Sequence, residues 1–474
     1  MAVRTPHEAP AALTPSAASP PVTALADEPD ALPRRLGLVA TTAIVVGTII
    51  GSGIFRVPGV VANAVGTPAA VAVVWVLGGV ITLCGALAVA ELAAAFPRSG
   101  GLFVYLNEAY GPLVAFLFGW TMLFLGPAAL GALALVFAEY LGTIVPLPPA
   151  GVRVVAALLI LAVSSVAYRS VRGMGGLVSA ASGAKVAAIL TLVLAAFLLG
   201  SGDAGSFGRG APLAADARWG GVALALVPAL WAYNGFQDSM SLAGEVRDPG
   251  RVLPRALLAG VAVVVALYLA ANAAYLHVLP FAVLRASPLV ASDTMVRVVG
   301  TAGAGAVAAM VMLSTFGAVA GLALANPRIF YAMADAGLLF APLARVHPRH
   351  RTPHMAVAAH AAVALACVGS RTFEQLTAAF VLGVFPFLAL TVAGVMVLRR
   401  TRRDLPRPYL TPGYPVVPLV FVIGTAWVIG SALVARPVTT LAGMGLTLLG
   451  VPVYWAWQRV ARGQARSQPL RSRG

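Results

Sequence analysis

Two glycine-containing stretches hold the residues of this sequence that are best suited to bind a small charged molecule. Residues 47–55 read GTIIGSGIF, and their three glycines within seven positions weaken a helix by about 1 kcal/mol each relative to alanine. Residues 228–236 read PALWAYNGF, with a proline at the start and a glycine near the end. Each stretch lies inside a long apolar run. The sequence therefore predicts that two helices lose their winding near the middle of a membrane.

A turn without helical hydrogen bonds exposes backbone groups of both polarities. Free N–H groups at the start of one half-helix can bind a carboxylate, and free carbonyl groups at the end of the other can bind an ammonium group. The alternative for Gly47 and Gly51 is a close helix contact, because they also have the GxxxG spacing. Interruptions at corresponding places in two halves of a chain are typical of a transporter's binding site. The second stretch therefore favours binding over helix contact.

Lys185 is the only lysine of the chain and lies in an apolar run over residues 176–200. An ammonium group at this depth costs about 3 to more than 10 kcal/mol on an isolated helix in a bilayer. The alternative is that the side chain extends to the membrane surface, but apolar residues flank it on both sides by a full turn or more. The sequence favours a buried lysine.

The composition defines the elements that must position these residues. Of 474 residues, 60% are hydrophobic and only 10% are charged, whereas about a quarter are charged in a soluble domain. The apolar residues form runs of roughly twenty, which match a hydrocarbon core of about 30 Å. The runs are rich in Ala, Leu, Val and Gly and do not alternate with polar residues, so helices are favoured over a β-barrel. The expected class is an all-α integral membrane protein.

Twelve transmembrane helices are expected, separated by segments with clusters of Pro, Gly or Arg. Their approximate ranges are 38–64, 68–95, 111–140, 152–168, 176–200, 220–244, 256–279, 302–332, 355–370, 375–398, 415–435 and 438–457. Residues 1–35 form a cytoplasmic tail that is rich in Pro, Ala, Ser and Thr and is expected to be disordered. The less apolar residues 280–300 are expected to form one short surface helix.

The formal net charge of +16 would suggest nucleic acid as a partner of a soluble protein. Here the arginines lie between the apolar runs and mostly on one side of the predicted membrane, so they report topology. Both termini are expected on the cytoplasmic side of the cytoplasmic membrane, and no nucleic acid partner is expected. Arg56 lies inside the first span, where it either faces an outer vestibule or extends to the interface.

The acidic residues near the ends of the predicted spans allow two interpretations. Glu91, Glu108 and Glu245 are either solvated or paired with Arg98 or Arg247 on the cytoplasmic side. A separate acid, Glu139, lies at the outer end of the third span and is expected to be an ordinary helix-end charge.

Cysteines and histidines give no sign of a metal site or an enzyme. Cys84 and Cys367 lie in separate apolar runs and are expected to be small buried side chains, not a disulfide or metal site. Four histidines fall within fourteen residues, but no cysteine or nearby carboxylate completes a site, so a basic cytoplasmic loop is favoured. These histidines are His347, His350, His354 and His360. No nucleophile–base signature, phosphate loop or zinc motif is present, so neither an enzyme nor a cofactor is expected.

Several motifs together resemble one family. Residues 51–55 (GSGIF) and 231–235 (WAYNG) are similar to signatures in the first and sixth helices of the amino acid–polyamine–organocation superfamily of permeases. Residues 96–101 (FPRSGG) and 244–249 (GEVRDP) are similar to its loops before helix three and after helix six. The motifs occur in the family's order over about residues 36–400, and most resemble the bacterial branch related to L-type amino acid transporters.

This resemblance implies a LeuT-like fold of twelve transmembrane helices, in which spans 1–5 and 6–10 form a five-plus-five inverted repeat with helices 1 and 6 broken. Residues 36–400 would form the ten-helix transport core, and residues 401–458 two additional transmembrane helices. Residues 459–474 would form a basic cytoplasmic tail that meets anionic lipid headgroups. Residues 102–103 (LF) and 334–337 (ADAG) depart from the family's pattern, outside the implied pocket.

The resemblance also implies which residues meet a substrate. Those implied near its carboxylate are Ser52, Gly53 and Ile54. Those implied near its amino group are Ile49, Trp231, Ala232 and Asn234. The aromatic ring of Trp231 would close over the substrate from outside.

A lysine in helix five is the family's sign of sodium independence, because it stands where sodium-coupled relatives bind a cation. Lys185 would take that role, meeting the broken first helix and helix eight, and would gain and lose a proton during the cycle. The candidate neighbours on helix eight are Ser314 and Thr315.

The implied function is secondary transport of a small neutral amino acid, sodium-independent, by exchange or by proton coupling. The alternative substrate is a cationic amino acid or a polyamine, with Asp238 as its partner. An alternative of another class is a membrane sensor or channel that does not transport. The expected partners are an amino acid, protons and membrane lipids, and the sequence predicts no oligomeric state.

Overall fold

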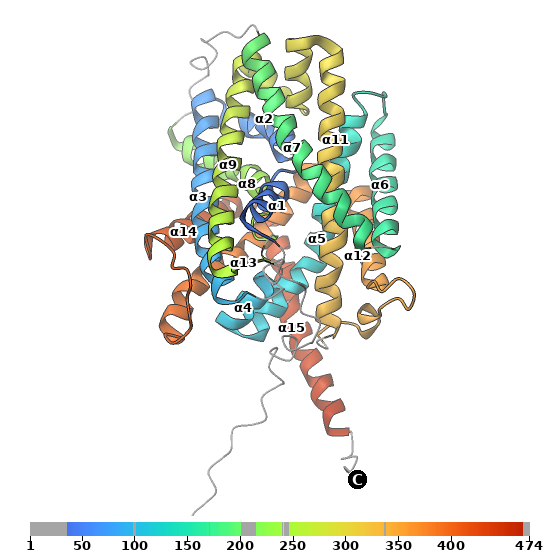
Figure 1. Ribbon diagram of the computed structural model, residues 1–474, viewed down its shortest axis with the longest axis vertical. Coiled ribbons are helices and arrows are strands. Elements are labelled where there is room, and N and C mark those ends of the chain that lie inside the picture. Colours follow the sequence, from blue (N-terminus) through green and yellow to red (C-terminus); the bar gives the residue numbers. More distant parts are fainter. Residues whose placement is uncertain are drawn as a thin grey trace, which may run out of the picture.

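Helices form nearly all of the described part of the chain, as a computed structural model shows (Figure 1). The structure describes residues 36–97, 101–169, 171–200, 215–238, 240, 246–335 and 338–467. The predicted tail over residues 1–35 lies outside the described residues, as do Arg98 and Glu245.

Fifteen α-helices follow one another along the described chain, with bounds as follows. They are α1 (Leu38–Ile49), α2 (Gly53–Val65), α3 (Pro68–Ala95), α4 (Leu102–Tyr110), α5 (Pro112–Leu141), α6 (Pro149–Arg169), α7 (Val171–Leu199), α8 (Ala215–Tyr233), α9 (Pro249–Val278), α10 (Phe281–Ala286), α11 (Val290–Asp335), α12 (His354–Ser370), α13 (Phe373–Thr401), α14 (Val416–Ala435) and α15 (Pro437–Ser467). A short 3₁₀ helix spans Ala341–Ala344.

Length and composition identify the helices that can cross a membrane. Within the described residues, seven helices are long and apolar enough to do so, and eight if the bent pair α1 and α2 is one span. The chain is therefore a multi-pass helical membrane protein, as its composition predicted. The total of twelve spans and the inverted repeat stay predictions.

The region between the seventh and eighth predicted spans differs from the expectation. Instead of one surface helix over residues 280–300, the short helix α10 is followed by the long helix α11, which begins at Val290. A kink at Gly300, whose φ is 77°, separates the first part of α11 from the rest. Glycine adopts this left-handed conformation without steric cost, so the chain changes direction there inside what is otherwise one helix.

Local capping explains the sharp turn between α2 and α3. Gly66 ends α2 with φ at 72°, and the hydroxyl of Thr67 accepts a hydrogen bond from the N–H of Ala70 at 3.2 Å. Pro68 then occupies the first turn of α3, where its missing N–H costs nothing. The sequence VGTP therefore ends one helix and starts the next within three residues.

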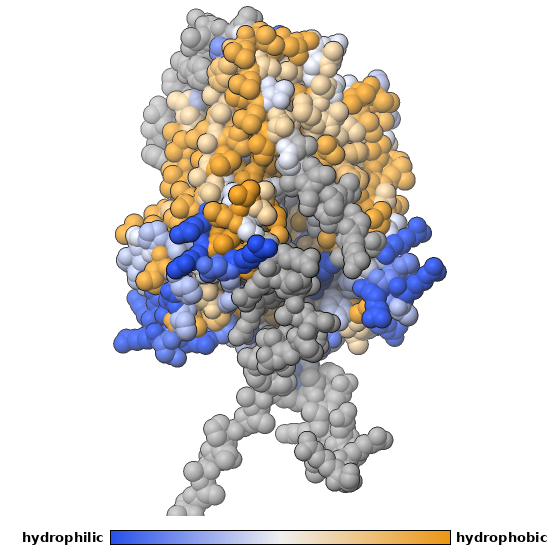
Figure 2. Space-filling view, in the orientation of Figure 1, coloured by the Kyte–Doolittle hydropathy of each residue, from blue (hydrophilic) through white to orange (hydrophobic). Residues whose placement is uncertain are grey.

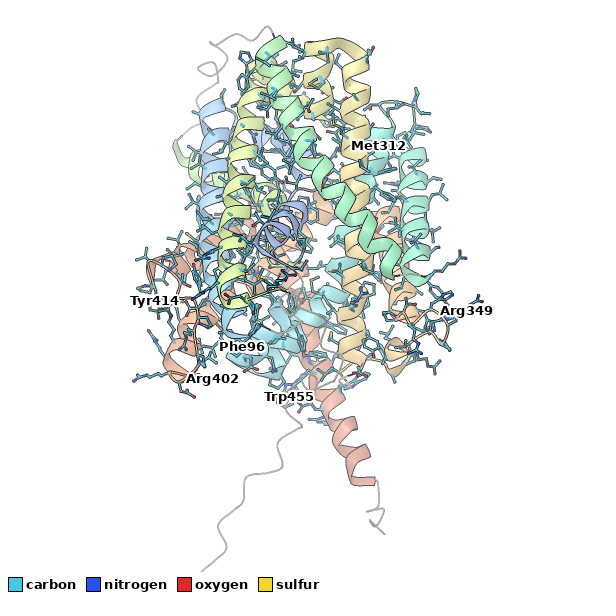
Figure 3. All side chains as sticks on the ribbon, in the orientation of Figure 1. Phe96, Met312, Arg349, Arg402, Tyr414 and Trp455 are labelled. Carbon is cyan, nitrogen blue, oxygen red and sulfur yellow. The ribbon has the colours of Figure 1, made fainter. Side chains whose placement is uncertain are left out.

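The helices run mostly along the long axis of the molecule (Figure 1). The helix α5 packs against α6, α11, α12 and α13, while α3 packs against α8 and α9, and α2 mainly against α8. Figure 2 shows one face that is largely hydrophobic over its upper part, with hydrophilic side chains gathered toward its lower end. Arg349 and Arg402 both lie at this lower end (Figure 3), which agrees with their predicted placement on one side of the membrane.

Candidate functional site

The first glycine-containing stretch interrupts the winding, as predicted. Helix α1 ends at Ile49, α2 begins at Gly53, and the two are bent by 45°. The residues between them, Ile50 to Ser52, are not helical. An apolar helix is thus broken within a membrane-sized segment, and its broken ends must find other hydrogen-bond partners.

The second stretch also loses its winding. Helix α8 ends at Tyr233, and a turn follows over residues 234–237. In this turn Gly235 has φ at 118°, a conformation that only glycine adopts easily. A side chain at Gly235 would also collide with the backbone of Thr48, at the end of α1. The two interruptions therefore pack against each other.

A second close approach joins the start of α2 to the end of α8. A Cβ atom at Gly53 would lie 2.5 Å from the Cα of Ala232, so the two backbones touch directly. At Gly51 the nearest atom to such a Cβ would be a side-chain carbon of Leu133, at 3.7 Å. Only the second of these two glycines is therefore required by the contact with α8.

Free hydrogen-bond donors lie at the start of α2. The N–H groups of Gly53 and Ile54 belong to the first turn and have no acceptor within their helix. The hydroxyl of Ser52 is buried, and among the described residues it has no hydrogen-bond partner. A carboxylate placed here would meet backbone and hydroxyl donors at the positive end of a helix.

One tyrosine that the sequence analysis missed lies within hydrogen-bond distance of a carbonyl group at each break. The hydroxyl of Tyr268, on α9, lies 3.3 Å from the carbonyl oxygen of Ile49 and 3.1 Å from that of Ala232. Tyr275 donates to the carbonyl of Ile54 at 3.2 Å. The two tyrosines lie seven positions apart, on one face of α9, and this spacing is the signal that could have identified them.

Lys185 lies against the broken first helix. Its side chain is 3% exposed, and its ammonium group donates to the carbonyl of Gly47 at 2.9 Å. Ser314 on α11 donates to the carbonyl of Gly51 at 3.4 Å. Thr315 is buried but donates within α11 to the carbonyl of Val311 at 2.8 Å, so its hydroxyl is not directed to the break.

Trp231 sits in an aromatic group beside the two breaks. Its ring meets that of Phe380 on α13 edge to face, with centroids 5.2 Å apart. The side-chain oxygen of Asn234 accepts a hydrogen bond from Gln237 at 2.9 Å, which in turn accepts from the N–H of Gly235 at 3.3 Å. Asn234 therefore helps to hold the turn, which Asp238 directly follows.

A cavity of about 300 Å³ lies beside this region and is separate from it. It lies between α3 and α9 and is lined largely by apolar residues, with Trp75 and Asn272 on its wall. Tyr233 and Tyr268 both pack edge to face against Trp75, with ring centroids 5.6 and 5.7 Å from its own. The aromatic rings thus lie between this cavity and the two breaks.

The predicted histidine group lies far from this site. The rings of His347, His350 and His354 surround Tyr168, with centroids 5.4 to 6.1 Å from its ring. His360 lies apart from them on α12, buried beside Phe330. The described residues contain no group of three side chains placed to bind a metal ion. Cys84 and Cys367 are free thiols.

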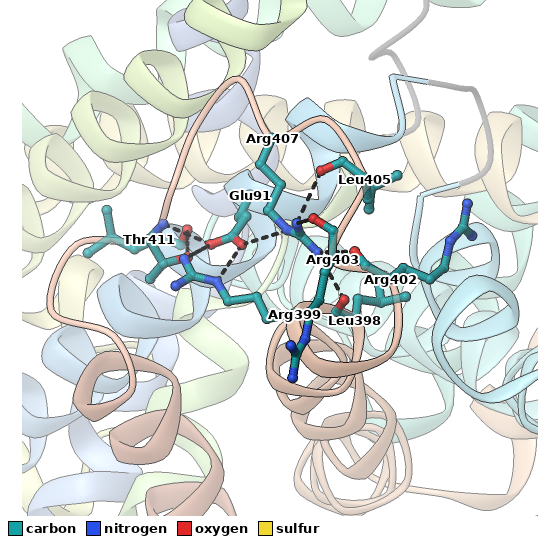
Figure 4. A network of polar contacts seen from close by, with 9 residues as sticks. Glu91, Leu398, Arg399, Arg402, Arg403, Leu405, Arg407 and Thr411 are labelled. Atoms are coloured by element: carbon teal, nitrogen blue, oxygen red, sulfur yellow. Dashed lines mark hydrogen bonds and ion pairs between the residues drawn. The ribbon is translucent and has the colours of Figure 1, made fainter.

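At the other end of the molecule from Arg56, Glu91 forms a dense polar network (Figure 4). Arg399 donates to its two carboxylate oxygens at 2.8 and 2.6 Å, and Thr411 donates through its N–H at 2.8 Å and its hydroxyl at 2.7 Å. Arg407 lies 3.7 Å from the carboxylate. We call Glu91, Arg399, Arg407 and Thr411 the inner cluster. The sequence analysis named the acid but not these partners.

Glu108 and Tyr409 lie at the same end of the molecule as the inner cluster. Glu108 pairs with Arg402 at 2.6 Å, and so joins α4 to the end of α13. Burial, together with the nearby Glu91 charge, raises the pKa of Tyr409 to about 12. The phenol therefore stays neutral and adds no charge to the inner cluster.

Known proteins resemble this chain over most of its length. The family described as amino acid permease matches residues 36–454. The serine/threonine exchanger SteT of Bacillus subtilis is 30% identical over 436 residues, which cover 91% of this chain and 98% of that protein. The human b(0,+)-type amino acid transporter 1 is 31% identical over 415 residues, 86% of this chain and 84% of its own. The large neutral amino acids transporter small subunit 2 of Rattus norvegicus is 33% identical over 451 residues, 90% and 82% of the two chains.

Proposed function

Because this chain belongs to the amino acid permease family, we propose that it carries small neutral amino acids across the cytoplasmic membrane by a sodium-independent route. It is an amino acid transporter and not an enzyme. The observation that carries the proposal is the contact between the two helix interruptions, where the start of α2 meets the end of α8.

In this proposal the substrate bridges the two interruptions. Its carboxylate accepts hydrogen bonds from the N–H groups of Ser52, Gly53 and Ile54 and from the Ser52 hydroxyl. Among the described residues the buried Ser52 hydroxyl has no partner, and the first-turn N–H groups of α2 have no acceptor within their helix, which supports this placement. The ammonium group is held by carbonyl oxygens at the two helix ends, those of Ile49, Trp231, Ala232 and Asn234, with the Trp231 ring as cover.

A neutral substrate fits the residues around the breaks. Asn234 contributes no charge, and its side chain already holds Gln237. Asp238 follows the turn, and its carboxylate would favour a cationic amino acid or a polyamine. Competition of arginine or putrescine against a labelled neutral amino acid separates the two substrate classes.

Lys185 would make the cycle independent of sodium. Its ammonium group contacts the carbonyl of Gly47, one turn before Gly51, whose carbonyl contacts Ser314. A fixed positive charge beside these carbonyls is a substitute for a bound cation, and it could release a proton during the cycle. The name of the exchanger SteT supports exchange as the mode of transport, with proton coupling as the other mode.

The membrane arrangement that goes with this function has twelve spans, two inverted repeats of five and both termini in the cytoplasm. The broken first helix, the interrupted sixth span and the arginine-rich loops at one end of the molecule support it. Residues 401–458 would add two helices to a core over residues 36–400.

Uptake into proteoliposomes tests the function. A panel of labelled amino acids is offered with sodium or choline outside, and with or without a pH gradient. We expect saturable uptake and counterflow of small neutral amino acids, unchanged in choline. Strong loss of uptake in choline would refute the role of Lys185. Flux without saturation or counterflow would indicate a channel, and binding without flux would indicate a sensor.

The two glycines of the first break provide a matched pair of variants. Gly53→Ala places a methyl group against the Ala232 backbone, so we expect it to abolish transport, whereas Gly51→Ala meets only a flexible leucine and should keep most of it. Uptake is measured for variants that express at parental levels. Equal activity of the two variants would contradict the proposed substrate cradle, which is the start of α2 together with the end of α8.

A further inference from the structure

The hollow between α3 and α9 opens on the side of α3 that faces lipid. Ala69 and Ala72 line it and are exposed, and Val73 and Val76 of the same helix are exposed beside them. These four residues are spaced by three, one and three positions, so they form one stripe along α3. Because α3 is long and apolar enough to cross a membrane, an exposed apolar stripe on it meets acyl chains. The opening of the hollow therefore lies in the hydrocarbon region.

The hollow lies near the start of α3 and the end of α9. On α3 its lining runs from Pro68, the first residue of the helix, to Trp75, which is about 10 Å deeper at 1.5 Å per residue. On α9 it runs from Leu269 to Leu276, close to the end of that helix at Val278. In the proposed membrane arrangement both of these helix ends are on the outer side. The hollow then belongs to the outer leaflet.

Small side chains create the hollow and leave its wall apolar. Ala69, Ala72 and Ala273 leave space where larger residues would fill it. The amide nitrogen of Asn272 already donates within α9 to the carbonyl of Tyr268, at 2.8 Å, so it does not require a polar occupant. An apolar hollow holds water poorly, whereas an alkyl chain in it gains dispersion contacts. Its volume of about 300 Å³ is about twice that of a cavity of roughly 150 Å³ that binds benzene, so it admits part of a chain.

Trp75 connects the hollow to the two helix breaks. Its side chain is fully buried, and its backbone carbonyl accepts a hydrogen bond at 3.1 Å from the hydroxyl of Tyr233, the last residue of α8. Its ring also packs against Tyr268. The hydroxyl of Tyr268 lies 3.3 and 3.1 Å from the carbonyl oxygens of Ile49 and Ala232. An occupant that packs against Trp75 therefore acts on both breaks.

We propose that the hollow binds one acyl chain of a phospholipid from the outer leaflet, and that the bound chain braces Trp75 against the two tyrosines. The opening in a lipid-facing stripe and the absence of charged side chains among the described lining residues identify the occupant as a chain. The bracing part rests on the proposed function, because the carbonyls of Ile49 and Ala232 would hold the ammonium group of the substrate. The bound chain then keeps the substrate cradle in its binding arrangement.

Brominated lipids test the site, because bromine on an acyl chain quenches tryptophan fluorescence only at close contact. The protein is reconstituted in mixtures of dioleoylphosphatidylcholine and its dibrominated analogue. The emission of the parent minus that of Trp75→Phe gives the signal of Trp75. Since Trp75 is buried, lipid at the outer surface of the helices does not reach it. We expect this signal to fall in direct proportion to the brominated fraction, as for one chain at one site, and to lose most of its intensity in pure brominated lipid.

Two substitutions at Ala72 distinguish a filled hollow from an empty one. Ala72→Phe fills the hollow with a ring. Ala72→Asn makes its wall polar, because an amide in an apolar hollow needs hydrogen-bond partners and retains water. Both should abolish the quenching of Trp75. The matched controls Val76→Phe and Val76→Asn carry the same new side chains one turn further along the exposed stripe, outside the hollow, and should keep the quenching.

The KM of uptake tests whether the chain braces the cradle. In Ala72→Phe the ring replaces the chain, so we expect a KM within about twofold of the parent, whereas the KM of Ala72→Asn should rise about fivefold. Ala273→Asn makes the same change from α9 and should raise the KM as well. The Val76 controls should keep the parental KM.

Several results would overturn the proposal. They are a Trp75 signal that brominated lipid does not change, quenching that persists in Ala72→Phe, or an equal KM in Ala72→Phe and in both asparagine variants. Variants are compared only at parental expression and melting temperature, and Ala273→Asn takes the place of Ala72→Asn if that variant does not fold. Quenching does not require transport, so a parent without amino acid uptake would defeat the proposed function while the lipid site is still measured.

Discussion

The two ends of α13 carry ion clusters of opposite design. At the inner end, the carboxylate of Glu91 is 2% exposed and accepts four hydrogen bonds, two from Arg399 and two from Thr411. At the outer end, Arg56 is shared between two partly exposed carboxylates, and one of these contacts lacks good hydrogen-bond alignment.

This difference indicates which end of α13 is held more firmly to the neighbouring helices. A buried charge whose partners are all in place is costly to expose, because each partner would lose its hydrogen bond in a poorly solvated site. A partly exposed carboxylate exchanges an internal contact for water at a smaller cost. The inner cluster therefore holds α13 to α3 and to the loop before α14, whereas the outer group of Arg56, Glu139 and Glu374 holds α13 to α2 through two carboxylates that already meet solvent.

The largest expected effect comes from removing the centre of the inner cluster. Glu91→Ala leaves Arg399 and Arg407 without their carboxylate, so we expect the free energy of unfolding to fall by about 3–5 kcal/mol. Thermal melting of the detergent-purified protein measures this, with Glu108→Ala as a control that should cost about 1 kcal/mol or less. Equal losses in the two variants would remove the distinction between a buried and a partly exposed pair.

Replacing the guanidinium group of Arg399, which donates through two nitrogens, by an ammonium group should lower the stability by an intermediate amount. Arg399→Lys keeps the charge but loses one of the two parallel hydrogen bonds to Glu91 and the guanidinium contact over Tyr414, at 4.0 Å. We expect a loss of about 1–3 kcal/mol, because an ammonium group cannot replace a bidentate guanidinium. A melting temperature equal to that of the parent would show that charge alone holds this end.

A single hydroxyl group tests how finely the inner cluster is built. Thr411→Val removes the hydroxyl that donates to Glu91 at 2.7 Å, while the N–H of the same residue still donates at 2.8 Å. The expected loss is about 1–2 kcal/mol, measured by the same melting assay. No loss would mean that the carboxylate is already satisfied by its other three hydrogen bonds.

A higher salt concentration should distinguish the two ends of α13, and we expect this effect to be the smallest of the four. Raising the NaCl concentration from about 0.05 to about 0.5 M shortens the screening length and weakens exposed ion pairs more than buried ones. In a variant without Cys84 and Cys367, we expect a Ser52→Cys thiol to react about twofold faster with a membrane-impermeant thiol reagent added from outside, with little change in melting temperature. A fall in melting temperature without faster labelling would assign the weak contact to the inner end.

Much of this molecule is determined by its sequence alone. Long apolar runs can only be helices in a membrane, because the bilayer offers no partners for backbone groups. The glycines around Gly51 and Gly235 determined where two helices end, since helix propensity is a local property. A lone lysine in an apolar run had to find a buried partner, and Lys185 lies against the carbonyl of Gly47.

Only the tertiary structure decided which distant side chains meet. Arg56 and Glu374 are 318 positions apart, and Arg399 and Glu91 are 308 apart, so no local pattern relates them. The same holds for Tyr268, which reaches carbonyls of two separate helices. Such pairs depend on how helices rotate and pack against each other. For the same reason the kink at Gly300, which turns one part of α11 against the rest, was not evident in the sequence.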